Sequence, residues 1–239
     1  ILIALLNAIL GLAGNKKIVS LTFLNAFNLQ EYLNDKLTIL DVKVVDGTGA
    51  RYNVEMQVAP DESYIQRIMY YLDKLYTEQL KEKEPYDKLC KAISISILNF
   101  VLFQEETDLH NIYRFLNIKS KRELTDLKEL HFIELPKFKK DKPKGTMSKF
   151  EKWLHALKFG ENYAYDIDNL PEELKEEEEI VMALQEMVRA SNDEMVRQIL
   201  DMRSKARHEE ASRLYQAEQR GIKKGKEEGK EEGKKEGKK

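Results

Sequence analysis

The stretch from Leu37 to Val58, LTILDVKVVDGTGARYNVEMQV, constrains the fold more than any other part of the chain. Two runs rich in β-branched residues flank the sequence DGTG at positions 46–49. Runs of this kind, bounded by turn residues, predict a β-hairpin. Because side chains alternate between the two faces of a strand, each of these strands has one apolar and one polar face.

The hydrophobic pattern also predicts the register of the hairpin. If the apolar faces lie on the same side of the sheet, Val45 pairs with Arg51 and Asp41 pairs with Glu55. A slip by one residue would pair Leu40 with Glu55 and bury charge. Two carboxylates therefore converge on one polar patch, where they repel each other unless a cation lies between them. Magnesium is such a cation, because hard ions prefer carboxylate oxygen.

The order of Asp41, Glu55 and Gln57 resembles the active-site hairpin of the PD-(D/E)XK nuclease superfamily. The resemblance is to its branch of recombination-promoting nucleases and transposases, in which Gln replaces the usual Lys. The segments YYLDKLY, ISISILNF and HFIELPKF and the glycine-punctuated charged tail extend it over most of the chain. Without these further segments, an Asp and a Glu in a hairpin would be weak evidence for a metal site, since exposed acidic strand residues are common.

The resemblance implies a metal-dependent DNA endonuclease that hydrolyses phosphodiester bonds, associated with recombination, mobile elements or defence. Asp41 and Glu55 are the implied ligands of Mg²⁺, or of Mn²⁺, and the backbone carbonyl of Met56 completes the shell. Gln57 stands where Lys usually stands; it has no charge and cannot act as a base, so it could only orient water or phosphate by hydrogen bonds. Lys43 shares a face with Asp41, and we expect it to restore the missing charge.

Residues 61–83 change to helical periodicity and predict a helix after the hairpin. Arg67 and Tyr71, four residues apart, share one face of it. The resemblance makes Arg67 a candidate for holding a phosphate near the metal, with Tyr71 beside it; a surface Arg packed along Tyr71 is the alternative. The expected buried stripe consists of Ile65, Ile68, Met69, Leu72, Leu75 and Tyr76.

The remaining pattern predicts an α/β fold. Residues 1–12 predict an apolar core helix, 19–23 a short strand, 92–103 a fully buried central strand, 109–116 and 130–135 further strands, and 150–159 a small amphipathic helix. Strand, helix and strand in this order are what a mixed sheet with covering helices requires. Together with the resemblance, this predicts a restriction-endonuclease-like mixed sheet flanked by helices, with a helical C-terminal extension and a charged low-complexity tail.

Lysines cluster in a segment with Pro and Gly after Pro136, and DNA is the partner they suggest. A basic loop at the margin of the sheet could contact a DNA backbone, with Lys139 and Lys140 as the candidate residues. A solvated loop without a partner is the alternative. The net charge of −2 does not decide between them, because phosphate contacts need only a local basic patch.

Composition divides the chain into three predicted parts. They are a nuclease-like domain at 1–159, an acidic helical extension at 160–220, and a tail of Gly, Lys and Glu at 221–239. Ser191 and Glu194 form a predicted capping box, which favours two helices at 172–190 and 192–220 that could also form a homodimer. The chain starts with Ile1 inside an apolar run, so we expect a fragment whose preceding stretch, in the family, adds an acidic residue.

Other functions find little support in the sequence. The single Cys90 excludes a disulfide framework and a Cys-based zinc site, and the four histidines lack paired ligand spacing. The apolar runs are too short to cross a bilayer, so we expect a cytoplasmic protein without a membrane partner. Two alternatives to the nuclease stay open: a catalytically weak or inactive nuclease fold that acts in DNA binding or assembly, and an interaction protein whose helices from 172 onward oligomerise.

Overall fold

The computed structural model describes residues 1–24, 38–139, 146–163 and 169–192, together with 215, 219–222 and 225–226. Internal contacts divide the chain into one unit of residues 1–29 and 37–191 and another of residues 30–36 and 192–239. The elements below belong to the first unit. Most of the predicted helix at 192–220, including Glu194 of its capping box, and Lys140 fall outside the described residues, as does nearly all of the tail. Ser191 is described and belongs to a helix that ends at Asn192.

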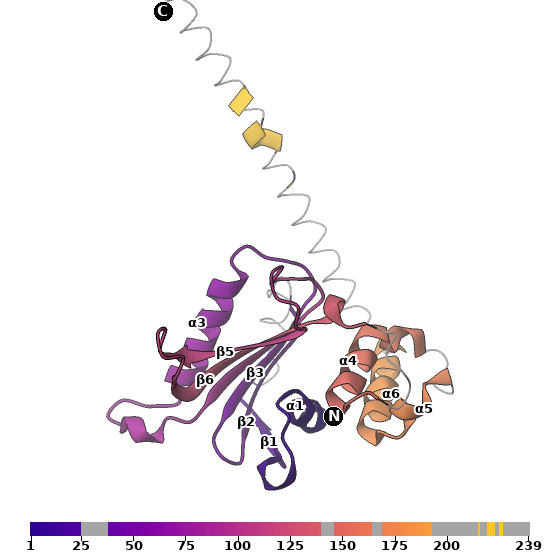
Figure 1. Ribbon diagram of the computed structural model, residues 1–239, viewed down its shortest axis with the longest axis horizontal. Coiled ribbons are helices and arrows are strands. Elements are labelled where there is room, and N and C mark those ends of the chain that lie inside the picture. Colours follow the sequence, from indigo (N-terminus) through magenta and orange to yellow (C-terminus); the bar gives the residue numbers. More distant parts are fainter. Residues whose placement is uncertain are drawn as a thin grey trace, which may run out of the picture. The chain divides into compact units, whose positions relative to one another are not determined.

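A six-stranded mixed sheet forms the centre of this unit, in the order β1-β2-β3-β4-β6-β5 (Figure 1). β3, β4 and β6 are parallel to one another, while the pairs β1–β2, β2–β3 and β5–β6 are antiparallel. This topology confirms the predicted α/β class. The strands are β1 (Leu21–Phe23), β2 (Thr38–Asp46), β3 (Arg51–Gln57), β4 (Ala92–Leu98), β5 (His110–Leu116) and β6 (Glu123–Glu134).

Helices cover both faces of the sheet (Figure 1). Alternating residues of β4 show this: Ile95 belongs to the core under α1, whereas Ala92 and Leu98 pack against α3. The helices are α1 (Leu2–Ile9), α3 (Tyr64–Thr77), α4 (Lys149–Phe159), α5 (Glu172–Lys175) and α6 (Glu178–Asn192), with short 3-10 turns at Gly14–Lys16, Tyr86–Lys88, Leu135–Lys137 and Gly160–Tyr163. None of the described helices is long and apolar enough to span a membrane.

The hairpin of β2 and β3 has the predicted register, with Val45 opposite Arg51 and Asp41 opposite Glu55. Its turn is held by Asp46, whose Oδ1 accepts hydrogen bonds from the backbone N–H and the hydroxyl of Thr48 at 2.8 and 2.7 Å. The hydroxyl of Tyr52 donates to Asp46 Oδ2 at 2.7 Å, and this tie connects the turn to the body of β3.

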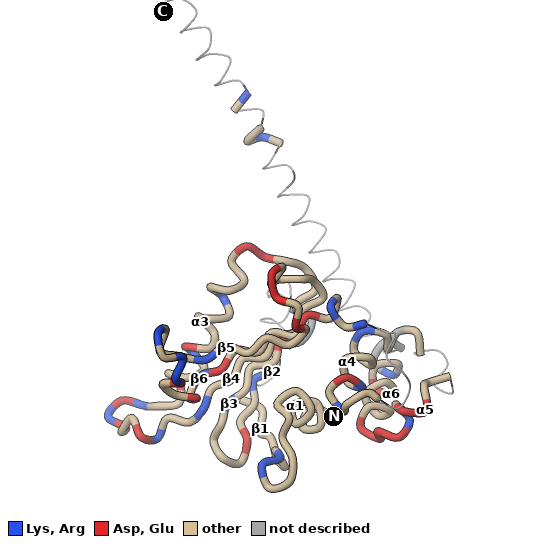
Figure 2. The backbone as a smooth tube through the Cα atoms, viewed as in Figure 1, with Lys and Arg blue, Asp and Glu red and all other residues tan. Residues whose placement is uncertain are grey.

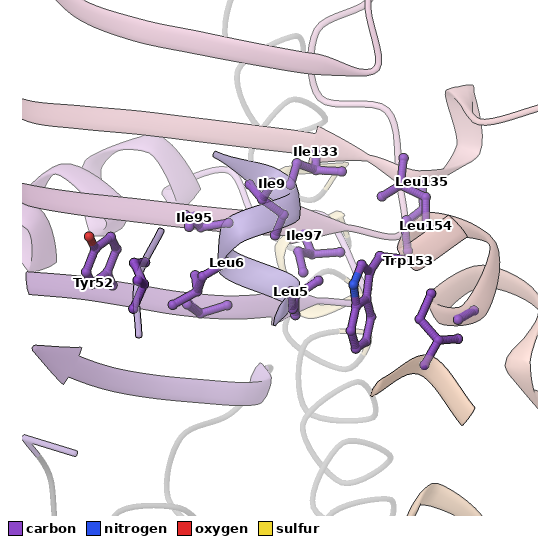
Figure 3. Packing of buried hydrophobic residues seen from close by; sticks show 14 of the residues in the cluster. Leu5, Leu6, Ile9, Tyr52, Ile95, Ile97, Ile133, Leu135, Trp153 and Leu154 are labelled. Atoms are coloured by element: carbon purple, nitrogen blue, oxygen red, sulfur yellow. The ribbon is translucent and has the colours of Figure 1, made fainter. Parts of the chain in front are cut away.

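The largest hydrophobic core lies on the face that α1 covers, as Figure 3 shows. Leu5, Leu6 and Ile9 of α1 pack there with Ile95 of β4 and Trp153 of α4. The prediction of a core helix at the start of the chain is therefore confirmed. The same core contains Leu174, Ile180 and Leu184 from α5 and α6. Figure 2 shows acidic positions near the labels of these two helices.

Several predicted boundaries were wrong. β4 ends at Leu98 rather than at residue 103, because the chain leaves the sheet there and places Phe100 against Tyr64 of α3. β6 begins at residue 123, before the predicted 130, since its first half extends as a hairpin with β5. The predicted helix at 172–190 consists of two pieces, α5 and α6.

Two residues of the predicted buried stripe of α3 are also placed differently. Ile65 and Met69 are 40% and 36% exposed. The helix contacts the sheet through a narrower stripe of residues at i, i+4, i+8 and i+11, so positions one residue further along turn toward solvent. The buried residues of this stripe are Tyr64, Ile68, Leu72 and Leu75.

Candidate functional site

Polar side chains occupy the middle of the sheet on the face that α3 covers. In the parallel ladder of β3 and β4, Asn53 pairs with Ser94, Glu55 with Ser96, and Gln57 with Leu98. The four polar residues in the first two pairs, like Gln57, are at most 3% exposed. Burying polar groups costs free energy unless they are bonded, so a concentration of them in a sheet centre indicates a functional site.

Glu55 is the buried carboxylate of this site. The backbone register places Asp41 of β2 directly opposite it, while the side chain of Asp41 falls outside the described part of the structure. Nη2 of Arg67 on α3 lies 3.9 Å from Oε1 of Glu55. A guanidinium at this distance offsets the cost of burying the carboxylate charge.

Gln57 has an amide group of fixed orientation. Its Nε2 donates to the carbonyl of Ala59 at 3.0 Å, and its Oε1 accepts from Nη2 of Arg67 at 3.0 Å. The two bonds distinguish the oxygen from the nitrogen of the amide. Gln57 therefore connects the end of β3 to the helix that follows it.

Arg67 is held from several sides. Besides Gln57 and Glu55, its Nη1 lies 4.0 Å from Oδ2 of Asp61, and its guanidinium carbon lies 5.2 Å from the ring centroid of Tyr64. The hydrogen bond from the backbone N–H of Ser63 lowers the pKa of Asp61, and the charge of Arg67 adds to this. Burial, followed by the negative charge of Glu55, raises the pKa of Tyr64.

Lys43 and Tyr71 meet beside this cluster. Lys43 Nζ lies 5.4 Å from the ring centroid of Tyr71, which stands one helical turn after Arg67 on α3. The structure thus brings five of the predicted residues to one region between β2, β3 and α3: Lys43, Glu55, Gln57, Arg67 and Tyr71. The cation in contact with both Gln57 and Glu55 is Arg67.

The other predicted positions are placed as follows. Met56 pairs with Leu40 and Ile97 in the sheet, and its side chain packs on the opposite, apolar face. Its carbonyl stays a predicted metal ligand. Lys139 is exposed, after the 3-10 turn that follows β6. Sequence reasoning missed Asn53, Ser94 and Ser96, although the alternation of Ile and Ser in AISISIL at 92–98 was the signal that β4 has a polar face.

The donor atoms of the site suit a hard divalent cation. In the described residues no three side chains of His, Cys, Asp or Glu form a metal-binding group. Glu55 and its ladder neighbour Ser96 supply oxygen atoms, and the position of Asp41 adds a second carboxylate. Oxygen-only sites of this kind fit Mg²⁺, which keeps several of its waters in proteins.

A mixed sheet with an acidic hairpin at its centre and helices on both faces is the architecture of a PD-(D/E)XK nuclease. Residues 1–217 match the model of the family described as PD-(D/E)XK nuclease family transposase. The chain belongs to this family. No curated protein and no solved structure matches the chain.

Proposed function

We propose that the chain is a metal-dependent DNA endonuclease whose active site lies between β2, β3 and the start of α3. The observation that carries this proposal is the register of Asp41 opposite Glu55, together with the contact of Arg67 with Gln57 and Glu55. In the reaction, a water oxygen forms a bond to phosphorus while one bridging P–O bond breaks. The sugar oxygen leaves and takes up a proton.

Asp41, Glu55 and the carbonyl of Met56 are the groups that would hold Mg²⁺ or Mn²⁺. When bound, the ion supplies a Lewis acid for the phosphate and lowers the pKa of water. The register supports this assignment, since Asp41 opposite the buried Glu55 adds a second negative charge to the one that Arg67 offsets.

Arg67 takes over the positive charge that Gln57 lacks. Gln57 and Asp61 hold the guanidinium from two sides, so its remaining N–H groups are pre-oriented for the oxygens of a phosphate. Gln57 then acts mainly by holding Arg67, rather than by contacting water or phosphate. Lys43, which lies over the ring of Tyr71, adds a second positive charge beside α3, and Lys139 and Lys140 would contact the DNA backbone.

Cleavage of supercoiled plasmid by the full chain tests the proposal. We expect nicking with Mg²⁺ or Mn²⁺, none with EDTA, and a loss of at least about 100-fold in Glu55→Gln and in Asp41→Asn. Glu123→Gln, which removes a half-exposed carboxylate from β6, is the matched control and should cleave like the unmodified chain.

Equal cleavage by the two hairpin variants and by the control would refute the site. No cleavage by a folded chain would favour the alternative, a catalytically weak or inactive nuclease fold that binds DNA. Association with recombination, a cytoplasmic location and a homodimer also belong to this proposal; a DNA-bound complex of two chains per duplex would support the last of these.

A further inference from the structure

Small polar residues form one side of the most buried strand. β4 directs Ile93, Ile95 and Ile97 into the main core, while Ser94 and Ser96 lie on the α3 face and are 0% exposed. Valine or isoleucine would ordinarily occupy such positions in a central parallel strand. The two hydroxyls therefore reduce the packing that this strand could otherwise achieve.

Several buried polar atoms of this layer have no hydrogen-bond partner among the described residues. Asn53 Oδ1, Ser94 Oγ and Ser96 Oγ are among them. The hydroxyl of Tyr64, whose pKa is affected by Ser96 and Glu55, lies near the last of these three. Native proteins leave very few such groups unsatisfied, because each one costs about 1–3 kcal/mol. Water is a partner that these polar atoms can take without a change in the fold.

The layer has the composition that buried water requires. A buried water makes about three hydrogen bonds, and it stays where polar groups surround it. Asn53 and Ser94 face each other across β3 and β4, and Glu55 and Ser96 form the next pair on the same face. Hydroxyl and amide groups can each donate and accept, so they can bind successive waters along the ladder.

We propose that Asn53, Ser94 and Ser96 bind a short chain of water molecules under α3, which ends at Glu55. Ser96 holds the last water beside the carboxylate and is a positioning residue for the water that hydrolysis consumes. This second part rests on the proposed function; the binding of water does not. The amide of Gln57 is less suited to this role, because Ala59 and Arg67 already fix both of its ends.

A high-resolution crystal structure of the full chain, grown with Rb⁺ as the monovalent cation, tests the binding of water. We expect solvent density at about 2.7–2.8 Å from Ser94 Oγ and from Ser96 Oγ, without anomalous signal from rubidium. In Ser96→Ala crystals the density nearest Glu55 should be lost or displaced. Hydroxyls turned onto backbone carbonyls, with no solvent density, would overturn the proposal, and a rubidium peak would show a cation site instead.

Cleavage kinetics test the role of Ser96. We expect Ser96→Ala to lower kcat about tenfold with KM unchanged, while Ser96→Thr, which keeps the hydroxyl, retains most of the activity. Ser120→Ala, at an exposed turn, is the matched control. An unchanged kcat in Ser96→Ala would overturn the positioning role. If the unmodified chain does not cleave, the proposed function fails, and the crystallographic test still decides whether water is bound.

Discussion

At the scale of single residues, Gln57 and Arg67 explain how a site without the usual Lys can remain electrostatically balanced. Gln57 connects β3 to Arg67, and Arg67 lies 3.9 Å from Glu55. A guanidinium can contact several groups at once because its N–H donors form a rigid fork. The guanidinium near Glu55 thus comes from helix α3, and Lys43 of the hairpin lies beside Tyr71 of the same helix.

The first residue-scale prediction concerns this guanidinium. Arg67→Met should lower plasmid cleavage about 100-fold, and Arg67→Lys about tenfold, because Lys keeps the charge but cannot span Gln57 and Asp61 together. A tenfold loss corresponds to about 1.4 kcal/mol of transition-state stabilisation. Arg122→Lys, at an exposed position, should not change the rate. Full activity of Arg67→Met in a metal-dependent assay would exclude Arg67 from the site.

The second residue-scale prediction concerns pH. Burial, followed by the charge of His131 at 3.0 Å, lowers the pKa of His110 from 6.5 to about 4. Between these values the unfolded chain binds a proton at His110 and the folded chain does not, so stability decreases as the pH falls from 6.5 to 4. Glu129 has a pKa below this range. Burial alone would raise its pKa, but hydrogen bonds from His131 and Lys91 lower it to about 2.

Urea unfolding at pH 7 and pH 5 measures this effect. We expect His110→Gln to lose less stability between the two pH values than the unmodified chain does. An identical loss in both proteins would show that His110 does not titrate in this range.

At the scale of elements, the hairpin was predicted well because its information is local. Alternating faces and a glycine turn determine its register without any other part of the chain. The contact of Gln57 with Arg67 could not be predicted, since it depends on how α3 crosses the sheet. Likewise, β4 ends at Leu98 because Phe100 packs against Tyr64 of α3. The apolar run alone does not show this contact.

The element-scale prediction concerns the turn of the hairpin. Gly49 has φ +88°, and a Cβ there would lie 2.7 Å from Sγ of Cys90. Gly49→Ala should therefore destabilise the fold through backbone strain, about 1–2 kcal/mol, and through this clash. Cys90→Ala removes the sulfur, so Gly49→Ala should cost less in that background. Denaturant unfolding of the four proteins checks this, and equal costs in both backgrounds would refute the clash.

At the scale of the whole molecule, the acidic helices are part of the core that supports the sheet. The acidic composition of these helices predicts an extension that begins at residue 160. The sequence shows their charge, but it does not show which residues they pack against. Leu174, Ile180 and Leu184 nevertheless lie in one hydrophobic cluster with Ile95 of β4. The predicted domain boundary after residue 159 stays open to the following experiment.

Leu184→Ala should destabilise the sheet together with α4, by about 2–5 kcal/mol, because it leaves a cavity in the shared core. Fluorescence of Trp153, the only Trp, and circular dichroism of the sheet should report the same shifted transition. Met187→Ala, at a residue that is 42% exposed, should have a small effect. A transition of Trp153 and of the sheet that Leu184→Ala leaves unshifted would support a separate extension after residue 159.

Binding of Mn²⁺, followed by electron paramagnetic resonance of the full chain, tests most directly whether Asp41 and Glu55 form one cation site. We predict one bound Mn²⁺ per chain that Mg²⁺ displaces, with a Kd weakened at least about tenfold, or about 1.4 kcal/mol, in both Asp41→Asn and Glu55→Gln. Glu123→Gln should bind like the unmodified chain. Equal binding by all four proteins, or no binding by any, would contradict the assignment of the hairpin as the metal site.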